Sequence, residues 1–520
     1  MPLTLFNESL LDEGNVRIIA IGRGGNDIRE FCIRYGVAYR IEVMLNDNVR
    51  EQREVVIDGF TIKVLGFSCL HDYLSQKNGQ YRYLCVIMDD YYKEVYDTLI
   101  SDLVVAEIDV DIYYYLNREN EIERSYREIY KDKPLEDLIV FRSGPHPTQY
   151  VRGMDFGDNS RALFEYMLSI ELNKIYQLVW IVKDPFEYER FKDVYNVSFI
   201  SYEWAHDGSK TQMDSYYHAL CCSKYLFFTD AYGFARNCRE DQIRVQLWHG
   251  CGFKSRVNFT RCEHRYEKMV VSGPAYKERH VWLFGLRDDQ VLVTGNPKDD
   301  WVFHPSKRGW ERFLKRTENA KVIFWLPTFR EAGKNLSNLN EYSLSGDTGL
   351  PVVDTQEKLQ RLNELLVRKG IFMVVKLHPY QRRDRVRCKG YSNIILIENE
   401  ELNEEDLSIN EMLGFADALI SDYSNVSIDY LILDRPIGYL LDDAKAYGES
   451  RGFIFDPLSD YLPGAELYGF DDMLRFISEI SDGIDSGFEK RKRLKKQLQT
   501  FDDDRSCQRV IDVLGIGEKE

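Results

Sequence analysis

The sequence predicts an α/β protein built on parallel sheets and divided into several domains. Short apolar runs alternate with amphipathic helical stretches along almost the whole chain, which is typical of β-α-β units with parallel strands. The chain has 520 residues, and a single hydrophobic core rarely serves more than about 300. We therefore expect two or three α/β domains.

The first domain is expected at residues 1–140. It opens with the apolar run VRIIAIG at 16–22, which leads into GRGGND and a helical stretch. Gly22 and Gly24 fit the dinucleotide-binding fingerprint, but Asp27 stands at its third glycine position and would repel a pyrophosphate. We expect a Rossmann-like module that does not bind NAD and that serves docking, regulation or a neighbouring activity.

Two further α/β domains are expected at residues 141–275 and 276–520. The strand-like runs of the second are QLVWIV, YLFFT and IRVQLWHG, and those of the third are VLVTG, KVIFWLPT, FMVVKLHP, IILIE, DALISD and PIGYLL. Two such units would face each other across a cleft. Ligands bind where parallel strands end and loops pass into helices, and the informative motifs all follow these ends.

Composition narrows the function class and the compartment. A formal net charge of −17 argues against nucleic acid as a partner, because phosphate binding needs a basic face. The sequence has no apolar run of 18 residues and its N-terminus does not resemble a signal peptide. Its ten cysteines show no CxxC spacing and are expected to be reduced thiols in the cytoplasm. No motif requires a metal or another cofactor.

Two histidines follow predicted strands. His249 lies in IRVQLWHGCGFKS, before Gly250 and Lys254, and His378 lies in FMVVKLHPY, two residues after Lys376. A histidine at a strand end can take a proton from a hydroxyl near neutral pH, and the glycines let a phosphate approach the backbone. The alternative for each histidine is a structural role in a turn.

A strand-to-helix turn and two cations complete the candidate site. The turn after the strand at 418–421 is rich in hydroxyl and amide groups, and the N-terminus of the helix that follows favours a phosphate. Its candidate donor-binding residues are Ser421, Asp422, Tyr423, Ser424, Asn425 and Ser427. Arg330 and Lys298 also follow strands and could bind phosphate oxygens. Helix capping and solvated loop charges are the respective alternatives.

Taken in order, these motifs resemble those of the CDP-glycerol glycerophosphotransferase family, the teichoic acid polymerases and primases of bacteria. The matching blocks are GMDFGDN (153–159), WHGCGFK (248–254), GNPKDD (295–300), LPTFR (326–330), KLHP (376–379), SDYSN (421–425), LDRP (433–436) and RGFIFD (451–456). The resemblance covers about residues 141–515. It departs at Cys251, Gly252 and Phe253, which replace Thr-Pro-Leu, at Lys298, which replaces Arg, and at Asn425, which replaces Ser.

The resemblance implies a GT-B fold and transfer of an alditol phosphate from CDP-glycerol or CDP-ribitol. His249 and His378 occupy the positions of the two essential histidines of the family. We expect His249 to act as general base and His378, Arg330 and the turn at Ser424 to hold the donor phosphates. Gly250, Lys254, Asn159 and Lys298 are assigned to the acceptor or phosphate side. Because Cys251, Gly252 and Phe253 flank that side, the departure there leaves the acceptor and the alditol open.

The expected acceptor is a polyol phosphate, a glycan or a lipid-linked acceptor, and the product is a teichoic acid or capsule polymer. The basic run at 490–496 could provide a peripheral membrane contact on the inner face of the membrane; the alternative is a solvated helix face. Two other functions stay open: a GT-B glycosyltransferase that uses a nucleotide sugar, and a non-catalytic polymer-binding protein. The released nucleotide would distinguish them.

Overall fold

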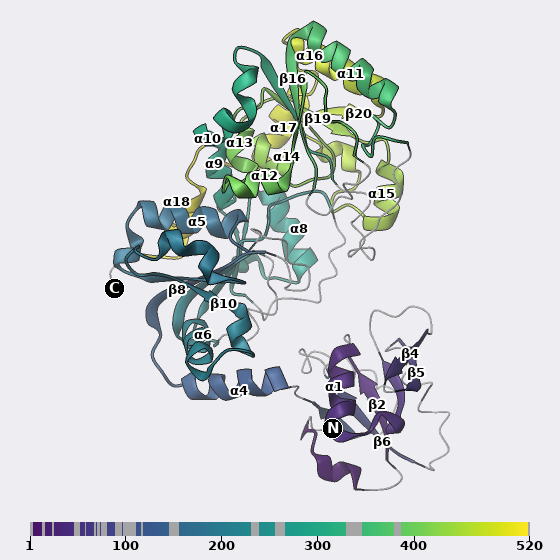
Figure 1. Cartoon of the computed structure of the whole chain (residues 1–520), viewed down its shortest axis with the longest axis vertical. Coiled ribbons are helices and arrows are strands. Elements are labelled where there is room, and N and C mark those ends of the chain that lie inside the picture. Colours follow the sequence, from purple (N-terminus) through teal and green to yellow (C-terminus); the bar gives the residue numbers. More distant parts are fainter. Residues whose placement is uncertain are drawn as a thin grey trace. The chain divides into compact units, whose positions relative to one another are not determined.

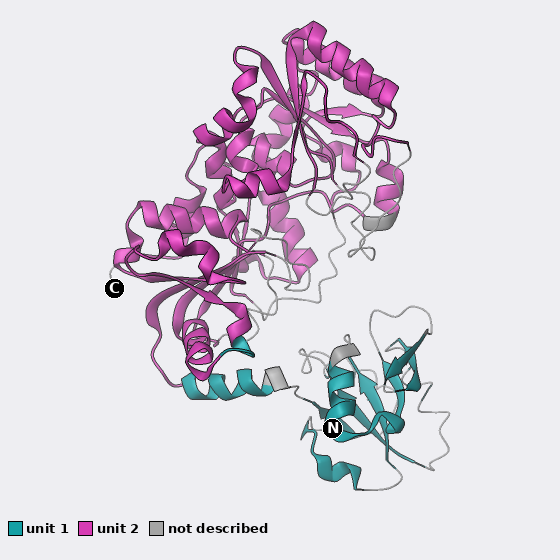
Figure 2. Cartoon of the chain, viewed as in Figure 1, with its two compact units in different colours: residues 1–131, 205–208 teal, residues 132–204, 209–520 magenta. Residues whose placement is uncertain are grey.

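The computed structural model divides the chain into two compact units, one of residues 1–131 with 205–208 and one of residues 132–204 with 209–520 (Figure 2). The residues that the structure describes are 4–12, 16–22, 25–45, 53–57, 59–66, 69, 73, 81–88, 96, 111–115, 118–144, 155–229, 239–254, 266–328, 346–378 and 386–517.

The first unit is a Rossmann-like sheet of order β1-β7-β6-β2-β3-β5-β4 (Figure 1). Its strands are β1 (Thr4–Leu5), β2 (Val16–Ile21), β3 (Ile41–Leu45), β4 (Arg53–Ile57), β5 (Phe60–Leu65), β6 (Arg82–Ile87) and β7 (Asp111–Tyr114), and its helices are α1 (Gly25–Tyr35) and α4 (Arg118–Tyr130). The described pairs are parallel except β4 with β5. Gly22 directly follows β2, and a Cβ there would overlap the carbonyl oxygen of Met88, so a larger residue would push the end of β2 away from the end of β6.

The second unit begins with a parallel sheet of order β10-β9-β8-β11-β12-β13-β14. Its strands are β8 (Glu136–Arg142), β9 (Gln177–Val182), β10 (Val197–Ser201), β11 (Ser223–Phe228), β12 (Ile243–Gln246), β13 (Lys268–Val271) and β14 (Val291–Val293). Helices α5 (Asp158–Ser169), α6 (Lys210–Cys222) and α8 (Pro274–Phe284) connect them. Because the strands are buried and parallel, they appear in the sequence as continuous apolar runs.

The second sheet of this unit is also parallel, with the order β17-β16-β15-β18-β19-β20. Its strands are β15 (Lys321–Trp325), β16 (Ile371–Lys376), β17 (Ile394–Ile397), β18 (Ala418–Ser421), β19 (Ile437–Leu440) and β20 (Ala465–Leu467). The helices around it are α9 (Asp300–Phe303), α10 (Lys307–Gly309), α11 (Gln356–Lys369), α12 (Asn399–Glu404), α13 (Asn410–Leu413), α14 (Val426–Leu431), α15 (Ala444–Arg451), α16 (Phe470–Ser481) and α17 (Phe488–Leu498). Helices α11 and α16 lie side by side (Figure 1) and close one hydrophobic core.

The end of the chain returns to the first sheet of the second unit. Helix α18 (Ser506–Val513) packs beside α5 (Figure 1), and Val510 and Ile511 belong to the core beneath that sheet. The carboxylate of Asp300 accepts hydrogen bonds from the backbone N–H groups of Ser506 and Cys507, at 2.8 Å each, and so satisfies unpaired donors at the start of α18. This crossing joins the two halves of the unit at a second place.

The sheets locate the domain limits differently from the sequence prediction. Residue 140 lies inside β8, because the residues after the charged helix α4 form the first strand of the second unit. Residue 275 lies inside α8, and β14 still pairs with β13 of the first sheet. The short run VLV therefore belongs to the half that precedes it, as an edge strand.

Candidate active site

The first predicted histidine lies in a tightly held turn after β12. Trp248 has a φ of 52° and Gly250 a φ of 104°, backbone conformations that disfavour ordinary side chains. The amide nitrogen of Asn159 donates to the carbonyl oxygens of Leu247 and Trp248, at 3.0 Å each. Asn159 is fully buried. Asn159 therefore holds the backbone of Leu247 and Trp248, just before His249. The sequence prediction had placed it on the acceptor side.

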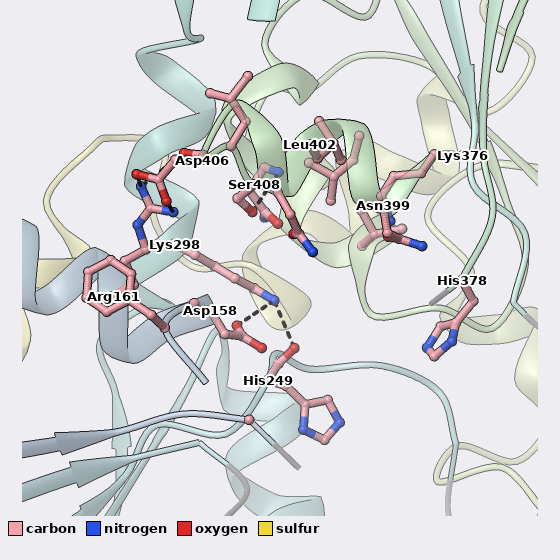
Figure 3. Close-up of a pocket in the computed structure, with 18 of the residues that line it drawn as sticks. Asp158, Arg161, His249, Lys298, Lys376, His378, Asn399, Leu402, Asp406 and Ser408 are labelled. Atoms are coloured by element: carbon pink, nitrogen blue, oxygen red, sulfur yellow. Dashed lines mark hydrogen bonds and ion pairs between the residues drawn. The ribbon is translucent and has the colours of Figure 1, made fainter. Parts of the chain in front are cut away.

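Lys298 also holds the turn at His249, through the carbonyl oxygen of that residue. Its ammonium group donates to the carbonyl oxygen of His249 at 2.9 Å and pairs with Asp158 Oδ1 at 3.1 Å (Figure 3). It also pairs with Asp429 Oδ2 at 3.3 Å. An ammonium group has three N–H donors, and these three oxygens match them. Lys298 lines the cleft, but its charge is committed to two carboxylates and a carbonyl. A phosphate bound here, as the sequence predicted, would have to compete with these three oxygens for the ammonium group.

The two histidines face one cleft from opposite halves of the second unit (Figure 3). His249 follows β12 of the first sheet, and His378 follows β16 of the second. The cleft has a volume of about 930 Å³, near the upper end of the range for small-molecule sites. Lys254 and Lys376 line it as well, so both cations that the sequence placed beside the histidines are at the site.

Both histidines are held in the neutral form. The pKa of His249 is lowered to about 4, mainly by burial; Asp158 partly offsets this effect, and Lys298 and Lys254 add to the lowering. Burial also lowers the pKa of His378 well below its ordinary value, together with Lys254, Lys376 and His249. A neutral imidazole can accept a proton. An anionic ligand between these cations would raise both pKa values, because opposite charge favours the protonated form.

Only some of the polar side chains in the turn between β18 and α14 line the cleft. Ser424 and Asn425 line the cleft, and the amide nitrogen of Asn425 donates to the carbonyl oxygen of His249 at 3.3 Å. A Cβ on Gly252 would overlap Asn425 Oδ1. Asn425 therefore links the donor-side turn of one half to the histidine turn of the other.

The remaining predicted donor-binding side chains of this turn point into the protein. Ser421 Oγ donates to the carbonyl oxygen of Leu326 at 3.1 Å, Asp422 accepts from the backbone N–H and hydroxyl of Thr328, Tyr423 OH donates to Asp443 at 2.8 Å, and Ser427 Oγ donates to the carbonyl oxygen of Ser424 at 2.9 Å. Buried polar groups need such partners, so these residues shape the turn instead of lining the cleft. Arg330 lies outside the described residues.

An ion-pair cluster that lines the cleft joins the two halves of the unit. Arg161 on α5 binds Asp406 with two nitrogens, at 3.1 and 3.3 Å, and Arg190 pairs with the same carboxylate at 2.8 Å. All three residues line the cleft. None of the three was predicted from the sequence, and neither were Asp158 and Asp429. Asp158 lies within a recognised motif, GMDFGDN at 153–159, but Arg161 and Asp406 are separated by 245 residues, and no local pattern connects them.

The segment that replaces Thr-Pro-Leu packs into the protein on both sides of Gly252. Cys251 and Phe253 are buried, Phe253 contacts the rings of Tyr439 and Phe455, and Cys251 Sγ lies 3.5 Å from the backbone nitrogen of Ser272. The departure therefore changes internal packing, whereas the expectation from the sequence was an effect on the acceptor side.

The basic run at 490–496 forms α17, and most of its charges are paired. Lys490 pairs with Glu466, Arg491 pairs with Asp434 and Asp485, and Lys495 and Lys496 both pair with Asp502. These carboxylates offset the positive charge that would attract an anionic membrane, so the predicted membrane contact loses much of its basis. Within the described part of the chain, none of the helices combines the length and apolar character needed to span a bilayer.

The paired parallel sheets and the cleft between them define an α/β protein of the GT-B type, which confirms the predicted fold class. The comparisons with known proteins agree: the family described as CDP-Glycerol:Poly(glycerophosphate) glycerophosphotransferase matches residues 135–515. The chain belongs to this family. The match covers the second unit and leaves out nearly all of the first.

Similar proteins include the teichoic acid poly(ribitol-phosphate) polymerase of Bacillus spizizenii, 27% identical over 59% of this chain and 49% of the relative. The teichoic acid glycerol-phosphate transferase of Staphylococcus aureus is 22% identical over 73% of this chain and 93% of that protein. The chain thus spans only about half the length of the first relative. The wall teichoic acid polymerase TagF has a similar solved structure, with a TM-score of 0.56, 20% identity and coverage of 82% of this chain and 97% of TagF. TagF has also been solved as single-histidine variants, one of them soaked with CDPG.

Proposed function

We propose that this protein transfers an alditol phosphate, in the first instance glycerol phosphate, from a CDP-activated donor to a hydroxyl acceptor and releases CMP. The observation that supports this most directly is the placement of two neutral histidines, His249 and His378, in one cleft of a member of this family. Both follow parallel strands, at the edge where α/β sheets bind ligands.

In the proposed reaction, an oxygen of the acceptor hydroxyl attacks the β-phosphorus of the donor. The new P–O bond forms a phosphodiester, and the bond from the β-phosphorus to the bridging oxygen breaks as CMP leaves with that oxygen. His249 takes the hydroxyl proton. Such reactions depend on positioning and on stabilisation of spread negative charge, and a positioned base contributes about 10²–10⁴-fold.

The donor phosphates are proposed to lie among His378, Lys376, Lys254 and the turn at Ser424 and Asn425, because these residues line one cleft. Lys254 and Lys376 supply positive charge to this part of the cleft, which suits the phosphates of a donor. As the donor binds, its negative charge raises the pKa of His249, so the base becomes stronger only in the loaded enzyme. We also propose that Lys298 positions His249 and does not bind the donor.

The family description names CDP-glycerol, and the relatives include proteins named for ribitol phosphate and for glycerol phosphate. We propose a CDP-alditol donor of this class and a polyol-phosphate, glycan or lipid-linked acceptor, with the reaction in the cytoplasm. We propose no resident cofactor, and activity that survives treatment with EDTA would support that proposal.

The test is to incubate the full chain with CDP-glycerol, CDP-ribitol, UDP-glucose and GDP-mannose, each with polyol-phosphate and lipid-linked glycan acceptors. We expect release of CMP and a phosphodiester signal in ³¹P NMR with a CDP donor. Release of UDP or GDP with a glycoside product would identify a glycosyltransferase and contradict the proposal. Binding of CDP-glycerol without turnover on every acceptor would favour a polymer-binding protein.

A further inference from the structure

Three side chains with different ligand atoms converge outside the cleft. The ligand atoms of Glu136, His218 and Cys222 all lie within 4.8 Å of one another, and no other such group of His, Cys, Asp or Glu was found within the described ranges. His218 Nε2 and Glu136 Oε1 are 3.0 Å apart. A tetrahedral zinc ion places its nitrogen, oxygen and sulfur ligands about 3.5 Å apart, so small side-chain rotations bring these three atoms to that spacing.

The backbone fixes this arrangement. His218 and Cys222 lie four residues apart on α6, so they share one face of the helix. Cys222 is the last residue of α6, and the next residue, Ser223, begins β11 and pairs in register with Glu136, the first residue of β8. The carboxylate is therefore on the first residue of β8 and the thiol on the residue just before β11, the strand that pairs with β8, so their approach does not depend on a loop.

Surrounding hydrogen bonds hold the end of α6 in place. The amide nitrogen of Gln242, which is 1% exposed, donates to the carbonyl oxygen of Leu220 at 2.8 Å and to that of Ser223 at 2.7 Å. Arg239, which pairs with Asp241, donates to the carbonyl oxygen of Lys133. A rigid support of this kind keeps metal ligands near their binding positions before the ion arrives.

We propose that Glu136, His218 and Cys222 bind one Zn²⁺ ion, with water completing the coordination. Thiolate, imidazole and carboxylate together suit zinc better than magnesium or calcium, which prefer oxygen ligands. The side chains of His218 and Glu136 are 39% and 49% exposed, so an ion can enter from solvent. On binding, the Cys222 thiol releases its proton to solvent, and the metal replaces the hydrogen bond between His218 and Glu136.

Some charged groups around the Cys222 thiol raise its pKa and others lower it. Burial raises the pKa of Cys222, as does the carboxylate of Glu136, whereas Arg239 and Lys133 lower it, and Asp241 raises it again. Because the ion must displace the thiol proton, zinc binds more tightly as the pH rises. The site lies where β8 and β11 begin, and the catalytic cleft lies where parallel strands end. The zinc would therefore connect α6 to β8 and take no part in the transfer.

The experiment is titration of the reduced, metal-free full chain with Co²⁺, which forms coloured complexes with thiolates, followed by competition with Zn²⁺. We expect one Co²⁺ per chain, a thiolate-to-cobalt absorption band and its loss when Zn²⁺ is added. Cys222→Ser should remove the band, and His218→Ala should weaken binding by at least about tenfold. The matched control is Cys221→Ser, which changes the adjacent buried thiol and should retain the band.

Two outcomes would overturn the proposal: no binding at equimolar Co²⁺ and protein, or a band that persists in Cys222→Ser. Circular dichroism checks that each variant is folded. If Cys222→Ser does not fold, the exposed position of His218 still permits the test. His218→Asn should bind Co²⁺ more weakly while its circular dichroism spectrum stays unchanged. An identical affinity in that variant would show that the three side chains form only a surface hydrogen bond beside a buried thiol.

Discussion

Removal of the Lys298 charge is the most informative perturbation of the site. The variant Lys298→Met keeps most of the side-chain volume and deletes the ammonium group that holds Asp158, Asp429 and the carbonyl oxygen of His249 together. It thereby leaves a buried carboxylate without its cation. Two effects are expected: a loss of stability in the second unit and a change in the ionisation of His249.

The size of the stability loss follows from burial. The side chains of Lys298 and Asp429 are only 9% and 2% exposed, and removing one partner of a buried ion pair costs about 3–5 kcal/mol. Asp158 is 29% exposed, so its pair adds at most about 1 kcal/mol. The carbonyl oxygen of His249 keeps a donor in Asn425. We therefore expect Lys298→Met to lower the free energy of unfolding by about 4 kcal/mol.

Tryptophan fluorescence in a urea titration measures this loss for the relevant unit alone. The chain contains seven tryptophans, and all of them lie in the second unit, so the signal does not mix with unfolding of residues 1–131. The matched control is Asp429→Asn combined with Lys298→Met. Since the double variant leaves no unpaired charge at this position, it should recover at least half of the lost stability.

The same variant tests the electrostatics of His249, the proposed base. Lys298 lowers the pKa of His249, so its removal raises that pKa, and the acid limb of the turnover profile should move to higher pH. A loss below about 1 kcal/mol, or a double variant no more stable than the single one, would refute the buried ion pair. An unshifted acid limb would refute the link from Lys298 to His249.

The other predictions concern His249 and residues of the second unit near it. His249→Ala should lose about 10²–10⁴-fold in turnover with little change in CDP-glycerol affinity, and unimpaired turnover would remove the base assignment. His280 is buried with a pKa of about 3; because its folded-state pKa lies below 6.5, stability is lost as the pH falls from about 6.5 towards 3. His280→Phe should reduce that slope by about 1.4 kcal/mol per pH unit, measured by urea unfolding at pH 5 and 6; an equal slope would contradict it. Gly252→Ala should impair folding or turnover, because its Cβ would overlap Asn425 Oδ1. Adding Asn425→Ala to the same chain should restore folding. Failure of that rescue would show that the side chains at 252 and 425 do not clash.

Much of the fold could be predicted from local patterns. Buried parallel strands are continuous apolar runs, so KVIFWLPT and FMVVKLHP identify β15 and β16, and the residues that follow them lie at the ligand-binding edge. His249 and His378 could be found in this way. The limit at residue 275 could not, because β14 has three residues and only its pairing with β13 shows to which half it belongs.

Contacts between distant segments could not be predicted from the sequence. Asn159, Lys298 and Asp429 were each visible as polar residues near a motif, but their roles depend on which partner each one meets across the fold. Lys298 appeared suited to phosphate because it follows a strand, yet two carboxylates neutralise it. Arg161 and Asp406 had no signal at all, since an ion pair between distant segments leaves no spacing pattern.

Three of the departures from the family pattern, at Gly252, Lys298 and Asn425, meet around one atom, the carbonyl oxygen of His249. Lys298 and Asn425 both donate to it, and Gly252 leaves the space that Asn425 occupies. Serine at 425 would be too short to make the same bond, and a larger residue at 252 would displace the asparagine. The three substitutions are therefore best understood as a single change in how the histidine turn is supported. Because the histidine ring still faces the cleft, this change is compatible with an unaltered chemical step, and it moves the search for acceptor specificity to other residues of the cleft.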